Sequence, residues 1–232
     1  MINIVMNQSI RYTGLGDKLD LMCLAKILHD RTKEPVKLHQ TSAVFKDFDF
    51  FKILYDMPIE YEYYPVYLDT DEIKFASYIE HNLKGFKQVD IYRSVSDFPK
   101  ITPKQFDFEL PEKFVTFQVD SNQTQAKCSP DEILRIKAYY REQGYKLVTV
   151  GGKSKNENLQ GKNECIDKII YAMSKAALHV GTDSGMMNLA KLVMPTSNIH
   201  IYTSDKKENK DYLSSFVKRC IEKGAKVNYS RG

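Results

Sequence analysis

Strand-like and helix-like segments alternate through the second half of the chain, and this alternation is the strongest constraint on the fold. Short β-rich apolar runs occur at 113–119, 145–152, 177–181 and 198–204. Each run is followed by a segment with helical spacing of its apolar residues, at 130–144, 164–176, 184–193 and 209–224. Such a succession predicts a parallel sheet with helices on both faces. Ligands of these sheets bind beyond the carboxyl ends of the strands.

The first half of the chain has fewer clear elements. Its sequence predicts strands at 2–6, 35–40 and 88–94, and helices at 17–32 and 69–85. Two aromatic segments, 45–55 and 60–68, fit no single period. We interpret the aromatic-rich stretch 48–67 as core and loop of the first lobe, with a sugar-stacking or partner-binding face as the alternative.

A segment without a clear period separates the two halves. Residues 98–113 contain three prolines, and we interpret them as a linker. The sequence therefore predicts two Rossmann-like α/β lobes, residues 1–108 and 109–232, whose parallel sheets face a cleft.

The composition is that of a soluble globular protein. The 232 residues are 42% hydrophobic and 28% charged, with a formal net charge of +4. Basic and acidic residues are interspersed, so we expect no nucleic-acid partner. No run approaches the about 20 apolar residues that span a bilayer, and the start of the chain lacks the pattern of a secretory signal. We expect a cytoplasmic protein.

Cysteine and histidine spacing gives no sign of a metal site. The four cysteines, at positions 23, 128, 165 and 220, form no CxxC pair, which indicates free thiols in a reducing compartment. The five histidines also lack the spacing of metal ligands. We therefore expect neither a bound metal nor another cofactor.

Three glycine-containing corners follow predicted strands. They are "GLGD" at 14–17, "GGKSK" at 151–155 and "VGTDSGMMNLA" at 180–190. The third leads into a helix, whose first N–H groups suit a phosphate, and Thr182, Ser184 and Gly185 lie at that point. Each corner alone also fits a plain strand-to-helix turn.

Two common nucleotide-binding motifs are excluded at these corners. "GLGD" is not the dinucleotide fingerprint G-x-G-x-x-G, because Leu19 occupies the third glycine position. "GGKS" is not a P-loop, because Leu147 stands where that loop requires its first glycine.

The third corner and the residues after it resemble a known signature. "VGTDSGMMNLAKLVMPTSNIHIY" is similar to the V-G-x-D-S-G-x-M-H-L-A segment of glycosyltransferase family 9, the heptosyltransferase-like enzymes with a GT-B fold. "FQVDSNQTQAKCSPDE", "LVTVGG" and "GLGD" resemble three further segments of this family, in the right order along most of the chain.

This resemblance implies a fold, an activity and a set of site residues. The C-terminal lobe would bind a nucleotide-sugar, and the N-terminal lobe would bind a glycan or glycolipid acceptor. The reaction would need no metal. A glycolipid acceptor would be compatible with peripheral contact of the protein with a membrane. Lys127 would neutralise the leaving diphosphate, and Asp17 would take the proton from the acceptor hydroxyl. From the residues alone, Asp17 also fits a helix N-cap or first-turn acid. The residues implied for the donor site are Gly14, Gly16, Gln118, Lys127, Gly151, Gly152, Thr182, Asp183, Ser184, Gly185, Met186 and Asn188.

The chain departs from the family pattern at three places. Asn188 replaces the histidine that follows the DSG, so it can hydrogen-bond but carries no charge. Residues 118–120 replace H-P-G, and residues 128–129 replace the R-W that follows the lysine.

These departures leave two alternatives to a glycosyltransferase. One is a non-catalytic glycan- or nucleotide-binding protein that retains the fold. The other is a nucleotide-sugar hydrolase or epimerase, which would act on the donor without an acceptor.

Overall fold

The chain divides into two compact units, Met1–Pro99 and Lys100–Gly232. The computed structural model describes residues 1–5, 15–40, 55, 57–63, 98–119, 128–152, 154–160, 165–204 and 215–230. The predicted helix at 69–85 and the predicted strand at 88–94 lie outside these residues. Each unit is described by itself below.

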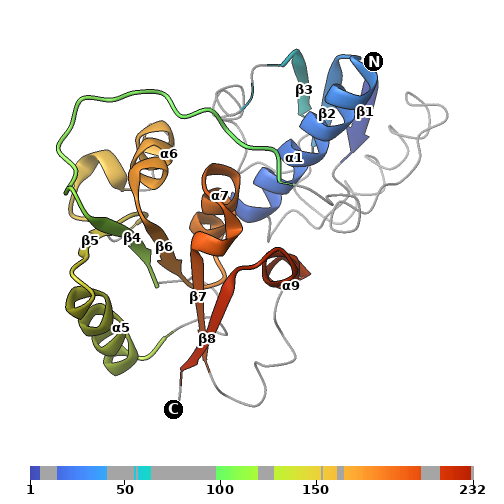
Figure 1. The fold of residues 1–232 in the computed structure, drawn as a ribbon. Helices are drawn as coiled ribbons and strands as arrows, with labels where there is room; N and C mark the ends of the chain where they lie inside the picture. Colours follow the sequence, from blue (N-terminus) through green and yellow to red (C-terminus); the bar gives the residue numbers. More distant parts are fainter. Residues whose placement is uncertain are drawn as a thin grey trace. The chain divides into compact units, whose positions relative to one another are not determined.

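The first unit contains a parallel three-stranded sheet in the order β1-β2-β3 (Figure 1). The predicted strands at its start and the predicted first helix are confirmed, whereas β3 lies partly in an aromatic segment that fitted no period. The helix buries Leu19, Met22 and Ala25. The elements are β1 (Ile2–Val5), α1 (Leu15–Thr32), β2 (Val36–Gln40) and β3 (Ile59–Tyr63).

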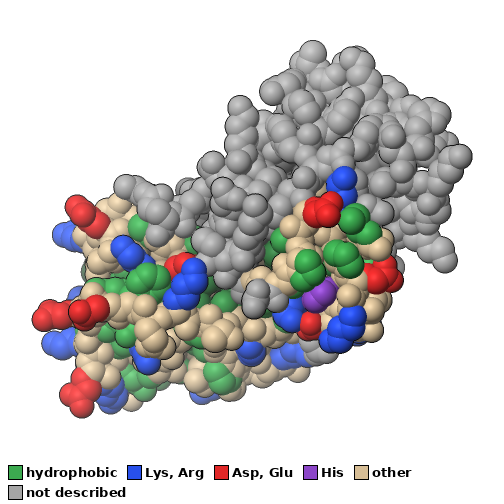
Figure 2. Space-filling view, turned by 90° about the horizontal axis from the view of Figure 1, so that it is seen from above, with side chains coloured by type: hydrophobic (Ala, Val, Ile, Leu, Met, Phe, Trp, Pro, Cys, Tyr) green, Lys and Arg blue, Asp and Glu red, His purple; other side chains and the backbone are tan. Residues whose placement is uncertain are grey.

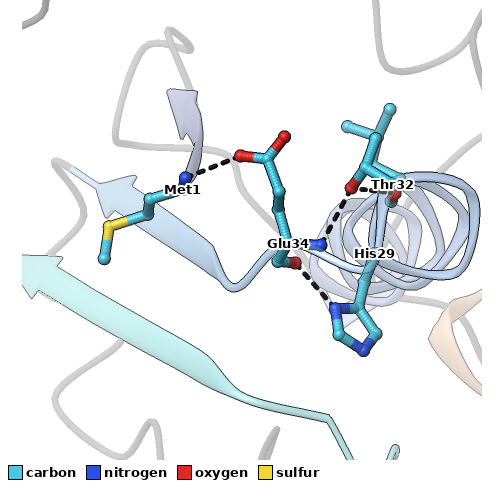
Figure 3. Close-up of polar contacts among 5 residues, drawn as sticks. Met1, His29, Thr32 and Glu34 are labelled. Carbon is cyan, nitrogen blue, oxygen red and sulfur yellow. Dashed lines mark hydrogen bonds and ion pairs between the residues drawn. The ribbon is translucent and has the colours of Figure 1, made fainter.

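Polar contacts fix the turn between α1 and β2 (Figure 3). The Thr32 hydroxyl donates to the Leu28 carbonyl at 3.0 Å and accepts from the Glu34 N–H at 3.1 Å. Nδ1 of His29 donates to the Glu34 carbonyl at 2.7 Å. The amino group of Met1 lies 2.6 Å from the Glu34 carboxylate, so the start of β1 is held against the same turn.

The second unit contains a parallel five-stranded sheet in the order β5-β4-β6-β7-β8. Its strand–helix alternation confirms the predicted parallel α/β architecture. The last strand, β8, was not predicted. The elements are β4 (Phe114–Gln118), α5 (Pro130–Glu142), β5 (Lys146–Thr149), α6 (Ile166–Lys175), β6 (Leu178–Gly181), α7 (Gly185–Val193), β7 (Ile199–Ser204), α9 (Ser215–Glu222) and β8 (Lys226–Ser230).

Helices cover both faces of this sheet (Figure 1). On one face, Phe117 and Val180 pack with Ile136 and Tyr140 of α5. Alternate residues of a strand point to opposite faces. Thr116 lies between Val115 and Phe117 in β4, so its side chain faces the layer of α6 and α7. The strands β4 and β6 end side by side at one edge of the sheet, at Gln118 and Gly181.

Residues 98–113 form no helix or strand. From Lys100 on they belong to the second unit, where several of them pack on its helices. The Lys100 ammonium donates to the carbonyls of Lys191 and Met194 at 2.6 and 2.7 Å, which satisfies two acceptors at the end of α7. The rings of Phe106 and Phe108 lie 6.0 and 5.6 Å from the ring of Tyr171. These contacts hold the segment against α6 and α7.

The described surface is mixed in charge. Figure 2 shows basic and acidic side chains interspersed over the coloured part of one face. All four cysteines are buried free thiols. Among the described residues, no helix is both long and apolar enough to cross a bilayer.

Candidate functional site

The corner between β6 and α7 joins the ends of two neighbouring strands. The N–H of Thr182 donates to the Gln118 carbonyl at 3.1 Å, which extends the pairing of β6 with β4. Ser184 is the N-cap of α7, in extended backbone geometry, and its hydroxyl accepts from the Met187 N–H at 3.4 Å. The same hydroxyl donates to Oε1 of Gln118 at 2.7 Å. The predicted residues Gln118 and Ser184 are therefore in direct contact.

Gly181, the last residue of β6, lies where there is no room for a side chain. A Cβ built there would lie 2.7 Å from the Gln118 carbonyl oxygen and 2.9 Å from Nε2 of His179. Both distances are shorter than real Cβ contacts allow, so glycine is required at this position by packing rather than by backbone conformation.

A second glycine corner meets the same site. Gly151 follows β5 with φ +90°, a conformation that favours glycine. A Cβ on Gly151 would lie 3.5 Å from the side chains of both Gln118 and Met186. The "GGKSK" and "VGTDSG" corners thus converge on Gln118. Gly152 is exposed, with nothing within 4 Å of an added Cβ.

The start of α7 has the electrostatics of an anion site. Gly185 and Met186 are its first two residues, and N–H groups at these positions have no acceptor within the helix. The aligned peptide dipoles add a partial positive charge there. Thr182 is fully buried and Asp183 is half-buried beside this turn.

Asn188 lies one turn further along α7 and is only 7% exposed. Its Oδ1 accepts from the ammonium of Lys191 at 3.4 Å, and Lys191 is fully buried. Sequence reasoning missed Lys191. The sequence feature that could have identified it is its position as the one charged residue in the apolar run "MMNLAKLV".

His179 is a buried neutral imidazole below the corner. Its Nδ1 lies 3.1 Å from the Thr116 hydroxyl. Complete burial lowers the pKa of His179 from 6.5 to about 3, because the low-dielectric interior disfavours the charged ring. No partner for Nε2 is found among the described residues.

The first glycine corner belongs to the other unit. Gly16 and Asp17 are the second and third residues of α1, so they lie in its first turn rather than in a loop before it. Asp17 is therefore a first-turn residue and not the N-cap. Gly14 and Lys127 lie outside the described residues. In the part of the chain that the structure describes, no group of three or more His, Cys, Asp or Glu residues has the arrangement of a metal site.

Comparisons with known proteins bear on the fold. No protein-family model and no curated protein sequence matches the chain. Among solved structures, the glycosyl transferase family 9 protein from Veillonella parvula DSM 2008 matches 99% of this chain and 85% of its own length, with a TM-score of 0.61 and 12% identity.

A second solved structure is TibC from enterotoxigenic E. coli H10407, a dodecameric iron-containing heptosyltransferase, in complex with ADP-D-β-D-heptose. It matches 87% of this chain with a TM-score of 0.51 and 15% identity, and this chain spans 58% of its length. The chain therefore has the mixed α/β fold with parallel sheets that is found in GT-B glycosyltransferases.

Proposed function

We propose that this protein is a glycosyltransferase that moves a sugar from a nucleoside-diphosphate sugar to a hydroxyl group of a glycan or glycolipid. The observation that carries the proposal is the contact of Ser184 with Gln118 at the start of α7. This contact fixes a helix N-terminus at the carboxyl edge of a parallel sheet, where α/β proteins bind phosphorylated ligands. The similarity of the fold to that of a known glycosyltransferase also supports the proposed glycosyl transfer.

The donor side of the reaction is assigned to the second unit. The free N–H groups of Gly185 and Met186 would hold the diphosphate, and Ser184 would add a hydroxyl contact. Lys127 would neutralise the charge that develops on the leaving diphosphate, so the reaction would not need a metal.

The acceptor side is assigned to Asp17 in the first turn of α1. Its carboxylate would accept the proton of the acceptor hydroxyl while the hydroxyl oxygen attacks the anomeric carbon. The bond from that carbon to the diphosphate breaks in the same step, and the nucleoside diphosphate leaves.

The transferred sugar is proposed to be a hexose or a heptose. The complex of TibC with ADP-D-β-D-heptose supports a nucleotide-sugar donor for a chain of this fold. Four buried free thiols are consistent with the reducing cytoplasm as the site of the reaction.

The first test is isothermal titration of the purified protein with ADP, GDP, UDP and CMP. Selective binding of ADP, GDP or UDP supports the proposal and identifies the base of the donor. Selective binding of CMP would contradict a nucleoside-diphosphate donor. If none binds, the proposal is wrong, and a non-catalytic glycan-binding protein becomes the better account.

A turnover assay then separates transfer from other donor chemistry. A transferase releases nucleoside diphosphate only when an acceptor is present. Release without any acceptor would instead indicate a nucleotide-sugar hydrolase.

A further inference from the structure

Two buried polar atoms at the corner between β6 and α7 have no hydrogen-bond partner. They are Nε2 of His179 and Oγ1 of Thr182, and no other buried side-chain nitrogen or oxygen among the described residues lacks a partner. Folded proteins pair nearly all such atoms, because a buried polar group without a partner costs free energy. Both atoms lie within residues 179–182, next to the proposed phosphate site, which indicates a local cause.

The two atoms differ in how close they lie to the solvent. Nε2 of His179 lies against Gly181, since a Cβ on that glycine would be 2.9 Å away from it. Thr182 is also fully buried, but it is the last buried residue before the helix, because residues 183–185 are partly exposed. A small movement of this turn would therefore bring a ligand to the Thr182 hydroxyl before the His179 ring.

The turn that contains Thr182 is fixed at both of its ends. The N–H of Thr182 donates to the Gln118 carbonyl at 3.1 Å, and Ser184 caps α7 by accepting from the Met187 N–H at 3.4 Å. The first N–H groups of α7 follow directly and favour an anion. The hydroxyl without a partner and the N–H groups without a helical acceptor therefore belong to one turn.

Packing alone does not account for a hydroxyl at position 182. Valine has the same branched shape as threonine, and it leaves no polar group unpaired where the protein offers no partner. The same strand already buries a valine, Val180. The stability of the free protein therefore favours valine at this position, and a partner that arrives with a ligand would explain the hydroxyl.

We propose that the nucleoside diphosphate supplies the missing partner, and that the Thr182 hydroxyl donates a hydrogen bond to one of its phosphate oxygens. Such oxygens are strong acceptors, and a hydroxyl can turn its proton toward them. Ligand binding thus completes a turn whose side-chain hydroxyl is unsatisfied in the free protein. This inference rests on the proposed function and adds to it a residue that links ligand affinity to the stability of the corner.

The test compares Thr182→Val with Thr182→Ser by isothermal titration and urea unfolding. Thr182→Val removes the hydroxyl and keeps the shape, so its urea midpoint should equal or exceed that of the wild type. It should bind the selected nucleoside diphosphate about 10- to 100-fold more weakly, the loss of one hydrogen bond to a charged group, and bind the unphosphorylated nucleoside unchanged.

Thr182→Ser should have the opposite profile. It keeps the hydroxyl, so diphosphate affinity should stay within about twofold of the wild type. It removes a buried methyl group, so its urea midpoint should fall. If Thr182→Val does not fold, Thr182→Ala replaces it, because alanine and serine both lack the methyl group and only alanine should lose diphosphate affinity.

Thr116→Val is the matched control, since Thr116 is also fully buried but its hydroxyl has partners. That hydroxyl lies 3.1 Å from Nδ1 of His179 and donates to the Leu178 carbonyl at 3.4 Å. Its removal should lower the urea midpoint and leave diphosphate affinity unchanged.

The outcomes separate this inference from the proposed function. A wild-type protein that binds no nucleoside diphosphate contradicts the proposed function. A wild-type protein that binds one, with Thr182→Val binding it equally well, contradicts only the role of Thr182. A lower urea midpoint of Thr182→Val with unchanged affinity would also overturn that role, because it would indicate a buried water as the partner of the hydroxyl.

Discussion

The Ser184 hydroxyl donates to Oε1 of Gln118 at 2.7 Å and joins the start of α7 to the end of β4. The two residues are 66 positions apart in the sequence. Ser184 also caps its helix by accepting from the Met187 N–H. One hydroxyl therefore fixes both the helix terminus and its place at the edge of the sheet.

Replacing Ser184 by alanine should weaken two properties at once. Loss of the cap should cost about 1 kcal/mol of stability. Loss of the contact with Gln118 should also release the start of α7 and weaken binding of the nucleoside diphosphate about tenfold. Urea unfolding and isothermal titration measure the two effects separately.

Ser129→Ala is the matched control for this variant. Ser129 is the N-cap of α5, where it forms a capping box with Glu132. Its loss should cost a similar amount of stability and leave nucleotide affinity unchanged. Equal affinity losses in the two variants would indicate that Ser184 acts only through helix stability.

Gly181→Ala should destabilise the second unit by about 1 to 3 kcal/mol, because the added methyl group overlaps neighbouring atoms. It would lie 2.7 Å from the Gln118 carbonyl, which is backbone and cannot move aside. Gly152→Ala is the control, since nothing lies within 4 Å of its added Cβ. Urea unfolding should leave that control within about 0.5 kcal/mol of the wild type.

The buried strands of the second sheet were predictable from sequence because parallel strands covered on both faces are continuous apolar runs. The two strands that sequence reasoning did not assign, β3 and β8, lie at sheet edges. Their sequences, IEYEY and KVNYS, mix polar with apolar residues because Glu60 and Lys226 face solvent. These two edge strands leave side chains exposed, so the apolar pattern in their sequences is weak.

The candidate site was predictable only in part. The serine at the start of α7 follows from the sequence, because serine is a preferred N-cap. Its contact with Gln118 is tertiary and depends on the order of the strands, which no local pattern contains. The burial of Lys191 was not predicted, because a lysine at helical spacing is usually on the surface.

Tyr140→Phe should remove about 1 to 2 kcal/mol of stability. The Tyr140 hydroxyl lies 2.6 Å from Nδ1 of His200 and 3.2 Å from the Tyr202 hydroxyl, so its loss leaves both groups short of a partner. Burial raises the pKa of Tyr140, which keeps this hydroxyl protonated as a donor. The neighbouring Tyr139→Phe, at a side chain that is 52% exposed, should change stability by less than about 0.5 kcal/mol in the same unfolding assay.

The stability of the protein should fall as the pH is lowered below about 6.5, in part because of His179. Its pKa is about 3 in the folded protein against 6.5 ordinarily, so between these values the unfolded chain binds a proton that the folded chain does not. This difference contributes a slope of about 1.4 kcal/mol per pH unit.

The variant His179→Gln should have a shallower slope, because glutamine does not titrate. Urea unfolding at a series of pH values from about 7 to about 5 measures both slopes. Parallel curves for the variant and the wild type would show that His179 takes up its proton equally well in both states. The contribution of His200, whose pKa is also lowered by burial, remains in both proteins and cancels in the comparison.

Asp17→Asn should strongly reduce the rate of sugar transfer while it leaves donor binding intact. An amide is nearly the same size as the carboxylate but cannot accept the proton of an acceptor hydroxyl, so the rate should fall about a hundredfold or more. The control is Asp30→Asn on the same helix, an exposed residue whose carboxylate accepts from Lys26 at 2.6 Å. Release of nucleoside diphosphate in the presence of acceptor measures transfer, and isothermal titration measures donor affinity. Full activity of Asp17→Asn would rule out Asp17 as the base, whereas loss of donor binding together with activity would assign it to the donor site instead.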